Sequence, residues 1–325
     1  MRAARLHGLR DLRVETLRVP ELGPGELLVR VEGCGICPTD LRKWLIGVND
    51  GDYPFNPGHE WVGIVQAVGA DVAGWEPGAR VYGDTYAGYA ELAALPVEPG
   101  PWSYGALAVD ASLPLERAIF VEPLADCLHA VHDQARVGAG DRVVVVGAGQ
   151  MGLQLVLAGA LAGARVLAVE PLAERRELAL AFGAEAAVAP EGWVSEAEGA
   201  DAVIVSVGEP ALVGPAIEAA APGGRVVLFA GFGDRAEATI DLNRIHYREV
   251  ELVGSEWIGV PPGTRRERYR EALALLESGE APLERLVTLR CGLDGIEAAF
   301  EAVRERRALK ALLVPSLTTP TRARP

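Results

Sequence analysis

The chain has 325 residues, half of them hydrophobic, and its formal net charge at pH 7 is −14. A chain of this length can bury a large core, and we expect two domains rather than one. The acidic balance and the scarcity of basic runs argue against a nucleic-acid partner, because phosphate binding requires clustered cations. Arginine carries nearly all the positive charge, since lysine occurs only at Lys43 and Lys310, but this bias by itself indicates no chemistry.

The sequence argues equally against a membrane partner and against secretion. No unbroken apolar stretch reaches the roughly 20 residues that cross a bilayer. The first residues lack the apolar core of a signal peptide. The four cysteines, Cys34, Cys37, Cys127 and Cys291, make no disulfide framework in a chain of this size. We therefore expect a cytoplasmic protein.

The first part of the chain has the pattern of short β-strands joined by turns. Residues 12–15 alternate, residues 27–32 form a strand, and residues 61–69 read as a buried strand that turns back into another. A short helix is expected over residues 40–44. Frequent glycine and proline between short strands indicate a barrel-like or irregular β domain.

The pattern changes near Glu122, where a helix is expected over residues 124–136. Continuous β-branched runs follow, and such runs are typical of parallel strands that are covered on both faces. They lie at residues 142–147, 165–170, 201–207, 225–230 and 250–254. Stretches rich in alanine and leucine separate these runs, so the middle of the chain predicts a doubly wound α/β sheet. Helices at 265–278 and 293–304 come after it and are expected to return to the first domain.

A glycine-rich turn follows the first of these parallel strands. Gly147, Gly149 and Gly152 match G-x-G-x-x-G between a strand and a helix, the arrangement that brings a pyrophosphate to a helix N-terminus. Glu170 ends the next strand, where a carboxylate accepts hydrogen bonds from the adenosine ribose and repels a 2′-phosphate. Glycine triplets alone are common turns, but with this strand, helix and carboxylate the pattern predicts NAD binding. Two arginines just after Glu170 could soften the preference for NAD over NADP.

The pair Cys34 and Cys37 has the C-x-x-C spacing of a zinc knuckle or a redox pair. A knuckle needs a second pair, which this chain lacks, and a thioredoxin-like pair is expected within a βαβ unit rather than here. Two small buried residues are the alternative reading if the cysteines are taken alone.

The segment Gly58-His59-Glu60 favours a metal site over that alternative. His59 follows a Pro-Gly turn at the start of a strand, a position that can project a ligand. A cysteine sulfur, a histidine nitrogen and a carboxylate together form an open catalytic zinc site, with room for water or substrate.

Four segments in this order resemble one known family. They are Gly35-Ile-Cys-Pro-Thr-Asp40, Gly58-His-Glu60, Glu122-Pro-Leu124 with His129-Ala130, and Gly147-Ala-Gly-x-x-Gly152. Over nearly its whole length the chain resembles the zinc-dependent medium-chain dehydrogenase/reductase (alcohol dehydrogenase) family, and most of all its polyol (sorbitol-type) and threonine dehydrogenase branches. The resemblance implies a GroES-like β-rich catalytic domain, residues 1–123 and 259–325, split around a Rossmann cofactor domain, residues 124–258.

The resemblance assigns roles to residues of both expected domains. It implies one catalytic zinc per chain, with candidate ligands Cys37, His59, Glu60 and Glu122, of which Glu60 or Glu122 would be the resting carboxylate ligand. Thr39 matches the residue that hydrogen-bonds the substrate oxygen, and Asp40 matches the carboxylate that orients the histidine. The implied NAD contacts are Gly147, Gly149, Met151, Gly152, Glu170, Arg175 and Gly231.

Two features depart from the family pattern. Relatives often carry a lobe with four cysteines that bind a structural zinc, but here only Gly83-Asp-Thr-Tyr-Ala87 fills that place. We therefore expect no structural zinc, and the shape of the pocket and the assembly are left open. Arg42 stands where many relatives have a histidine that passes a proton to solvent, so the proton is expected to leave through Thr39 and water or through the cofactor ribose.

The resemblance implies oxidation of a secondary alcohol, such as a polyol or cyclitol, to a ketone with hydride transfer to NAD. The alternatives are a zinc-free NADPH quinone or enoyl reductase of the same superfamily and a non-catalytic NAD-binding protein. Relatives pair their Rossmann sheets at the last strand, here residues 250–254, so a homodimer or homotetramer is expected.

Overall fold

The computed structural model describes the chain except for residues 48–52, 101–102, 234–235, 258, 318–320 and 323–325. The chain divides into two compact units. The β-rich unit comprises Met1–Glu122 with Pro262–Pro325, and the parallel-sheet unit comprises Pro123–Pro261. Residue 258, the expected end of the cofactor domain, lies outside the described residues.

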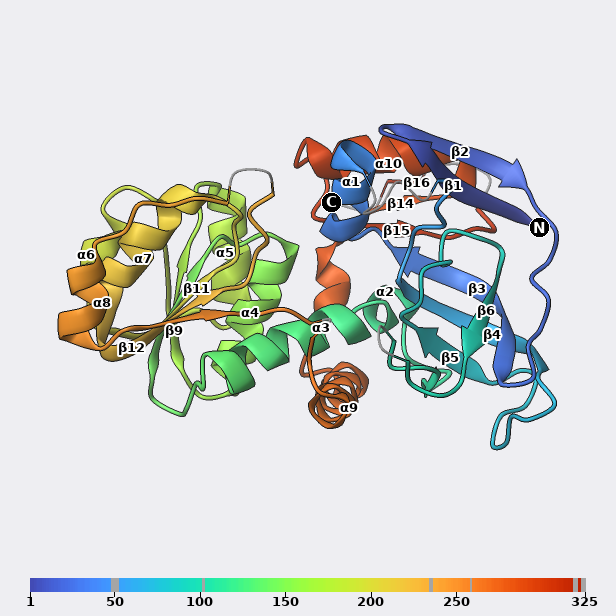
Figure 1. The fold of residues 1–325 in the computed structure, drawn as a ribbon, viewed down its shortest axis with the longest axis horizontal. Helices are drawn as coiled ribbons and strands as arrows, with labels where there is room; N and C mark the ends of the chain where they lie inside the picture. Colours follow the sequence, from blue (N-terminus) through green and yellow to red (C-terminus); the bar gives the residue numbers. More distant parts are fainter. Residues whose placement is uncertain (48–52, 101–102, 234–235, 258, 318–320, 323–325) are drawn as a thin grey trace. The chain divides into compact units, whose positions relative to one another are not determined.

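The β-rich unit is built on an eight-stranded sheet, and a separate hairpin pairs β1 with β2 (Figure 1). The sheet has the order β16-β14-β15-β3-β4-β5-β7, with β6 paired to β3 off this path. The strands are β1 Arg2–Gly8, β2 Asp11–Thr16, β3 Glu26–Gly35, β4 Glu60–Val68, β5 Arg80–Gly83, β6 Leu92–Pro96, β7 Leu107–Ala108, β14 Val287–Cys291, β15 Lys310–Leu313 and β16 Thr321–Arg322. The helices are α1 Pro38–Ile46, α2 Leu115–Ala118, α9 Pro262–Ser278 and α10 Ile296–Arg304, with 3₁₀ turns η4 Leu283–Leu286 and η5 Leu293–Gly295.

The C-terminal segment completes this sheet. Strand β15 pairs antiparallel with the end of β3, so that Leu312 lies opposite Gly35 and Leu313 opposite Cys34. The core beneath contains Trp61, which is fully buried, and Phe300 of α10. The pairing brings Lys310, at the start of β15, to the end of β3, although the two strands are far apart in the sequence.

The parallel-sheet unit has six strands, all parallel, in the order β10-β9-β8-β11-β12-β13. They are β8 Arg142–Val146, β9 Arg165–Val169, β10 Ala186–Val188, β11 Ala200–Val205, β12 Ala220–Leu228 and β13 Glu251–Gly254. The helices are α4 Gln150–Leu161, α5 Ala173–Ala181, α6 Trp193–Ala197, α7 Val213–Ala219 and α8 Leu242–Arg248, with the 3₁₀ turn η3 Pro210–Leu212. This is the doubly wound order, and the predicted α/β fold class is confirmed.

Two local features differ from the expectations. The single helix expected over residues 124–136 is α3, Val121–Leu128, followed by a π-helical stretch, η2 His129–Gln134. Strand β10 is only three residues long and too short to leave a hydrophobic period in the sequence. Among the described residues, no helix is long and apolar enough to cross a membrane.

Candidate functional site

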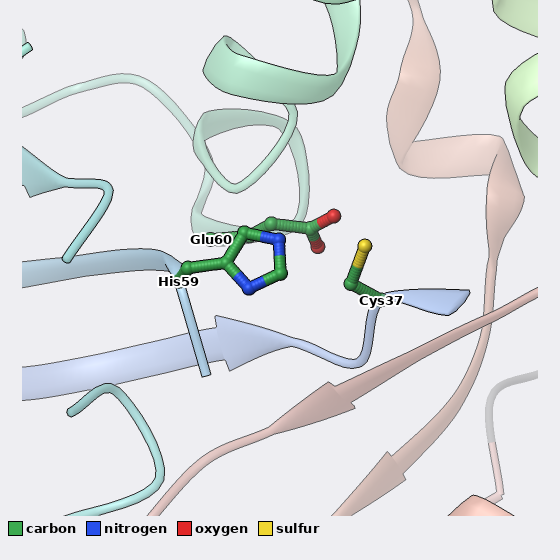
Figure 2. A group of neighbouring side chains, drawn as sticks. All are labelled: Cys37, His59 and Glu60. Carbon is green, nitrogen blue, oxygen red and sulfur yellow. The ribbon is translucent and has the colours of Figure 1, made fainter. Parts of the chain in front are cut away.

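Cys37, His59 and Glu60 converge in the β-rich unit. One ligand atom from each lies within 4.8 Å of the others, and all three residues are buried. Figure 2 shows the sulfur, the carboxylate and one imidazole nitrogen facing one another. The sequence predicted these three residues as candidate ligands, and the structure brings them together.

Local backbone geometry explains how these side chains are presented. Cys37 is the N-cap residue of α1, two residues after the end of β3, and Pro38 begins the helix. Gly58 has φ +92°, a conformation that favours glycine, and a Cβ there would lie 2.6 Å from the ring of Tyr89. The chain can therefore turn sharply before β4, which sends the side chains of His59 and Glu60 into the site.

Asp40 holds the imidazole from the side opposite the cluster. Its Oδ2 lies 3.5 Å from His59 Nδ1. The same carboxylate accepts hydrogen bonds from the Tyr89 hydroxyl, at 2.8 Å, and from the Gly58 amide, at 3.3 Å. Burial alone would raise the pKa of Asp40, but His59, Tyr89 and Gly58 hold it below its ordinary value. An oriented Nδ1 leaves Nε2 available as a ligand atom.

The cluster carries a polar atom that has no hydrogen-bond partner among the described residues. Glu60 Oε1 is buried and makes no hydrogen bond there. Burial raises the pKa of the Cys37 thiol, and the charge of Glu60 raises it further. A divalent cation would pair with the Glu60 carboxylate and favour the thiolate form of Cys37, which would offset the cost of burying both groups. The donors therefore fit a zinc ion.

Glu60 also forms an ion pair that the sequence analysis did not predict. Its Oε2 forms a fully buried ion pair with the Lys310 ammonium. A Cβ on Gly35 would lie 2.7 Å from Lys310 Cε, so the absence of a side chain there makes room for the pair. Burial opposes the charged ammonium, but Glu60 and Cys37 raise the pKa of Lys310 above its ordinary value.

Glu122 does not belong to the three-residue cluster. It lies near the start of α3, and its backbone amide donates to the Tyr82 hydroxyl at 3.3 Å. Burial raises the pKa of Glu122 to about 7; Glu60 adds to the rise, whereas His59 and Lys310 oppose it. The carboxyl thus lies within electrostatic reach of the cluster and stays a candidate ligand.

The short segment at residues 83–87, where the resemblance implies that the family's cysteine lobe is missing, folds against His59. The amides of Ala87 and Gly88 donate to the Gly58 carbonyl at 3.0 and 2.9 Å. These bonds bring the Tyr86 ring to 5.0 Å from the His59 ring, centroid to centroid. Thr39, the predicted partner of the substrate oxygen, is exposed on the first turn of α1.

In the parallel-sheet unit, the glycine-rich turn joins β8 to α4. Gly147 has φ +96°, and a Cβ there would collide with Val207. A Cβ on Gly152 would collide with the Gly147 carbonyl oxygen. Gly149, the N-cap of α4, has no atom within 4 Å of such a Cβ. Two of these glycines therefore satisfy internal packing, whereas the space beside Gly149 is open to a ligand.

The other predicted cofactor residues lie around the ends of the same strands. Glu170 is 4% exposed, and its carboxylate accepts from the amides of Ala148 and Leu172 at 2.8 and 3.1 Å. Met151 is on the first turn of α4, and Arg175 is partly exposed on α5. The carbonyl of Gly231, after β12, packs against Gly208.

Comparison with known protein families identifies both units. Residues 23–114 match the family "Alcohol dehydrogenase GroES-like domain". Residues 147–278 match the family "Zinc-binding dehydrogenase".

Individual relatives are similar to this chain over almost its full length. Sorbitol dehydrogenase of Bombyx mori is 27% identical, over 96% of this chain and 97% of the relative. (R,R)-butanediol dehydrogenase of Bacillus subtilis is 29% identical, over 97% and 100%. A crystal structure from Sinorhizobium meliloti 1021, described as a zinc-binding dehydrogenase bound to NADP, is 30% identical, has a TM-score of 0.86 and aligns over 97% and 99%.

The chain belongs to the zinc-type medium-chain dehydrogenase family, in the branch that contains the polyol dehydrogenases. It is an oxidoreductase with a GroES-like unit and a Rossmann unit. The predicted family and fold class are thus confirmed.

Proposed function

We propose that this protein oxidises a secondary alcohol of the polyol or cyclitol type to a ketone, with one catalytic zinc per chain and NAD as the hydride acceptor. The observation that carries the proposal is the buried convergence of Cys37, His59 and Glu60 in a chain of dehydrogenase ancestry. The relatives named as sorbitol and butanediol dehydrogenases support an alcohol with neighbouring hydroxyl groups as substrate.

Cys37, His59 and Glu60 would hold the zinc, with Glu122 as an alternative carboxylate ligand. Bound there, zinc would supply Lewis-acid chemistry that lowers the pKa of an alcohol hydroxyl toward neutrality. Thr39 would accept a hydrogen bond from the substrate hydroxyl and pass its proton outward to water. Asp40 would keep the His59 ring in the orientation that presents Nε2.

The choice of NAD rests on Glu170. A carboxylate at the end of β9 repels the 2′-phosphate of NADP and accepts hydrogen bonds from ribose hydroxyls. The S. meliloti relative was solved with NADP, so both cofactors belong in the first assay. Gly147, Gly149, Met151, Gly152, Arg175 and Gly231 are the further proposed contacts.

An unpaired strand edge supports a proposal for the assembly. Strand β13 ends the six-stranded sheet, with its outer edge unpaired within the described chain. Pairing of two such edges around a twofold axis would join two sheets into one. We propose a homodimer, or a homotetramer built from it, with a small-molecule alcohol or ketone as the other partner.

Two rival functions make different predictions about the cluster. A zinc-free NADPH reductase has no use for a buried thiol, imidazole and carboxylate that face one another. A non-catalytic NAD-binding protein needs no group that exchanges a proton with an alcohol. The short segment at residues 83–87 is the best support for the first rival, because it leaves no place for a structural zinc.

Replacement of Cys37 by serine tests the proposal. Zinc content by mass spectrometry and reduction of NAD⁺ or NADP⁺ are measured over polyols, secondary alcohols and amino alcohols, with and without a chelator. We expect Cys37→Ser to lose zinc and turnover together. Cys34→Ser is the matched control, because it makes the same change at another buried cysteine, outside the cluster. A Cys37→Ser protein with full zinc and full turnover would rule out the assignment.

A further inference from the structure

Lysine is rare in this chain: Lys310 lies in the candidate metal site, and Lys43 lies behind the Tyr86 ring that contacts it. Lys310 pairs with Glu60 inside the cluster. Lys43 lies on α1, and its ammonium is 5.2 Å from the centroid of the Tyr86 ring, which itself contacts His59. Lysine carries a compact charge on a flexible stem, whereas arginine offers a wide planar fork. In a chain that otherwise uses arginine, a lysine at this position calls for a specific explanation.

Two aromatic rings and one helix fix the position of the Lys43 ammonium. It lies 5.4 Å from the Phe55 centroid and 5.2 Å from that of Tyr86, and these rings contact each other at 5.0 Å. Ring faces attract a cation without occupying its hydrogen-bond donors. Among the described residues, no carboxylate forms an ion pair with Lys43. The ammonium is held in place, yet no described residue occupies its donors, so they can bind a ligand.

The helix directs Lys43 toward the same side as the proposed substrate contact. Thr39 and Lys43 are four residues apart on α1, so their side chains lie on one face about one turn apart. The Tyr86 ring is 5.0 Å from the His59 ring, which places the ammonium within about 10 Å of the imidazole centroid. An extended substrate of about six bonds, at roughly 1.2 Å per bond, spans most of the distance between the imidazole and the Lys43 ammonium when its end groups are included.

Because the protein is acidic, a single positive group near the site matters for the binding of an anionic substrate. A protein with a formal charge of −14 has a net repulsion for anions, so a fixed positive group favours docking of an anionic substrate. Lys43 provides one beside the metal cluster. Tyr86, 39% exposed, belongs to the short segment at residues 83–87, where the resemblance implies that the family's cysteine lobe is missing.

We propose that Lys43 is a specificity-determining residue that binds an anionic group, a phosphate or a carboxylate, at the end of the substrate remote from the reacting hydroxyl. The inference rests on the proposed alcohol oxidation and narrows its substrate class to anionic polyols. A purely structural role is the competing explanation, since Lys43 also lies in the last turn of α1 and links it to Phe55 and Tyr86.

The test compares three probes with the same number of carbons: D-sorbitol, D-sorbitol 6-phosphate and D-gluconate. Both kcat/KM and the dissociation constant, by calorimetry, are measured for the zinc-loaded enzyme. We expect at least one of the anionic probes to be preferred over sorbitol, and the two arms distinguish phosphate from carboxylate. Lys43→Met should reduce the ratio of anionic to neutral kcat/KM by about 10- to 100-fold. Lys43→Arg should restore part of that ratio, and added salt should weaken the preference.

Arg18→Met is the matched control, because it removes one positive charge from an exposed position of the same unit. It should leave the ratio unchanged. A structural role would instead lower the thermal stability of Lys43→Met and affect all three probes equally, which would overturn the inference. Turnover of sorbitol with no preference for either anion would also overturn it and leave the proposed function standing. Lys43-dependent binding of an anion without turnover of any probe would contradict the proposed function and leave the anion-binding role of Lys43 standing.

Discussion

The candidate sites of the two units depend on different features of the protein. In the parallel-sheet unit, the glycine-rich turn exposes backbone beside Gly149, and Glu170 is held by two backbone amides. In the β-rich unit, side chains from the start of α1, the start of β4 and β15 meet in a buried space, and several of them are charged. The first arrangement depends on backbone conformation, and the second depends on compensating charges that are removed from water.

This difference predicts which property of each unit a mutation will affect. A buried ion loses its solvation, so removal of its partner leaves an uncompensated charge and a large cost. A glycine in a turn matters only where a Cβ would meet another atom or a ligand. Mutations in the β-rich site should therefore affect stability and metal affinity, whereas those in the turn should separate packing from cofactor binding.

The largest expected effect is that of Lys310→Met. It leaves Glu60 buried without its cation, and we expect the zinc-free protein to lose about 3–5 kcal/mol of unfolding free energy. Urea unfolding in the presence of a chelator measures the loss. Arg13→Met, which breaks the exposed pair with Asp11, should not change stability detectably. A loss below about 1 kcal/mol for Lys310→Met would mean that the pair is not buried as described.

Next in size is the contrast between two glycines of the turn. Gly152→Ala puts a Cβ against the Gly147 carbonyl and should destabilise the fold by about 1–3 kcal/mol. Gly149→Ala meets no protein atom, so the melting temperature should stay near that of the unaltered protein, while NAD binding weakens because the Cβ occupies the pyrophosphate's space. Thermal unfolding and cofactor titration separate the two. Undiminished NAD affinity in Gly149→Ala would remove the turn from the proposed cofactor site.

The smallest expected effect comes from the residue that orients His59. Asp40→Asn removes the charge beside His59 Nδ1 and should weaken zinc binding by about 10- to 100-fold. Competition with a chromophoric chelator gives the affinity. Tyr89→Phe is the control, since it removes one hydrogen bond to the same carboxylate and leaves the His59 contact in place. Equal zinc affinity in Asp40→Asn and the unaltered protein would show that Asp40 has no positioning role.

Most of the fold could be predicted because its signals are local. The β-branched runs of the parallel strands and the glycines after β8 are readable from neighbouring residues, and all strands of the parallel sheet except β10 follow from them. Strand β10 and the π-helical stretch after Leu128 could not be read, because one is too short to leave a period and the other keeps the apolar pattern of a helix. Cys37, His59 and Glu60 were recognisable by residue type and order.

The contacts around those three residues depend on long-range pairing. Lys310 is 250 positions from Glu60 and reaches it only because β15 pairs with β3. Its sole sequence signal was its rarity as a lysine. Tyr86 and Phe55 belong to separate loops whose meeting over His59 and Lys43 no local pattern predicts.

By itself, the sequence determined the family, the α/β fold class and the donors of the candidate metal site, because these depend on residue type, order and local period. Only the tertiary structure decided which groups face one another: Lys310 with Glu60, Asp40 with His59, and the Lys43 ammonium with the rings of Phe55 and Tyr86. The physical reason is that burial makes the charges of the first two pairs costly, and the compensating group comes from wherever the fold brings one within a few ångströms.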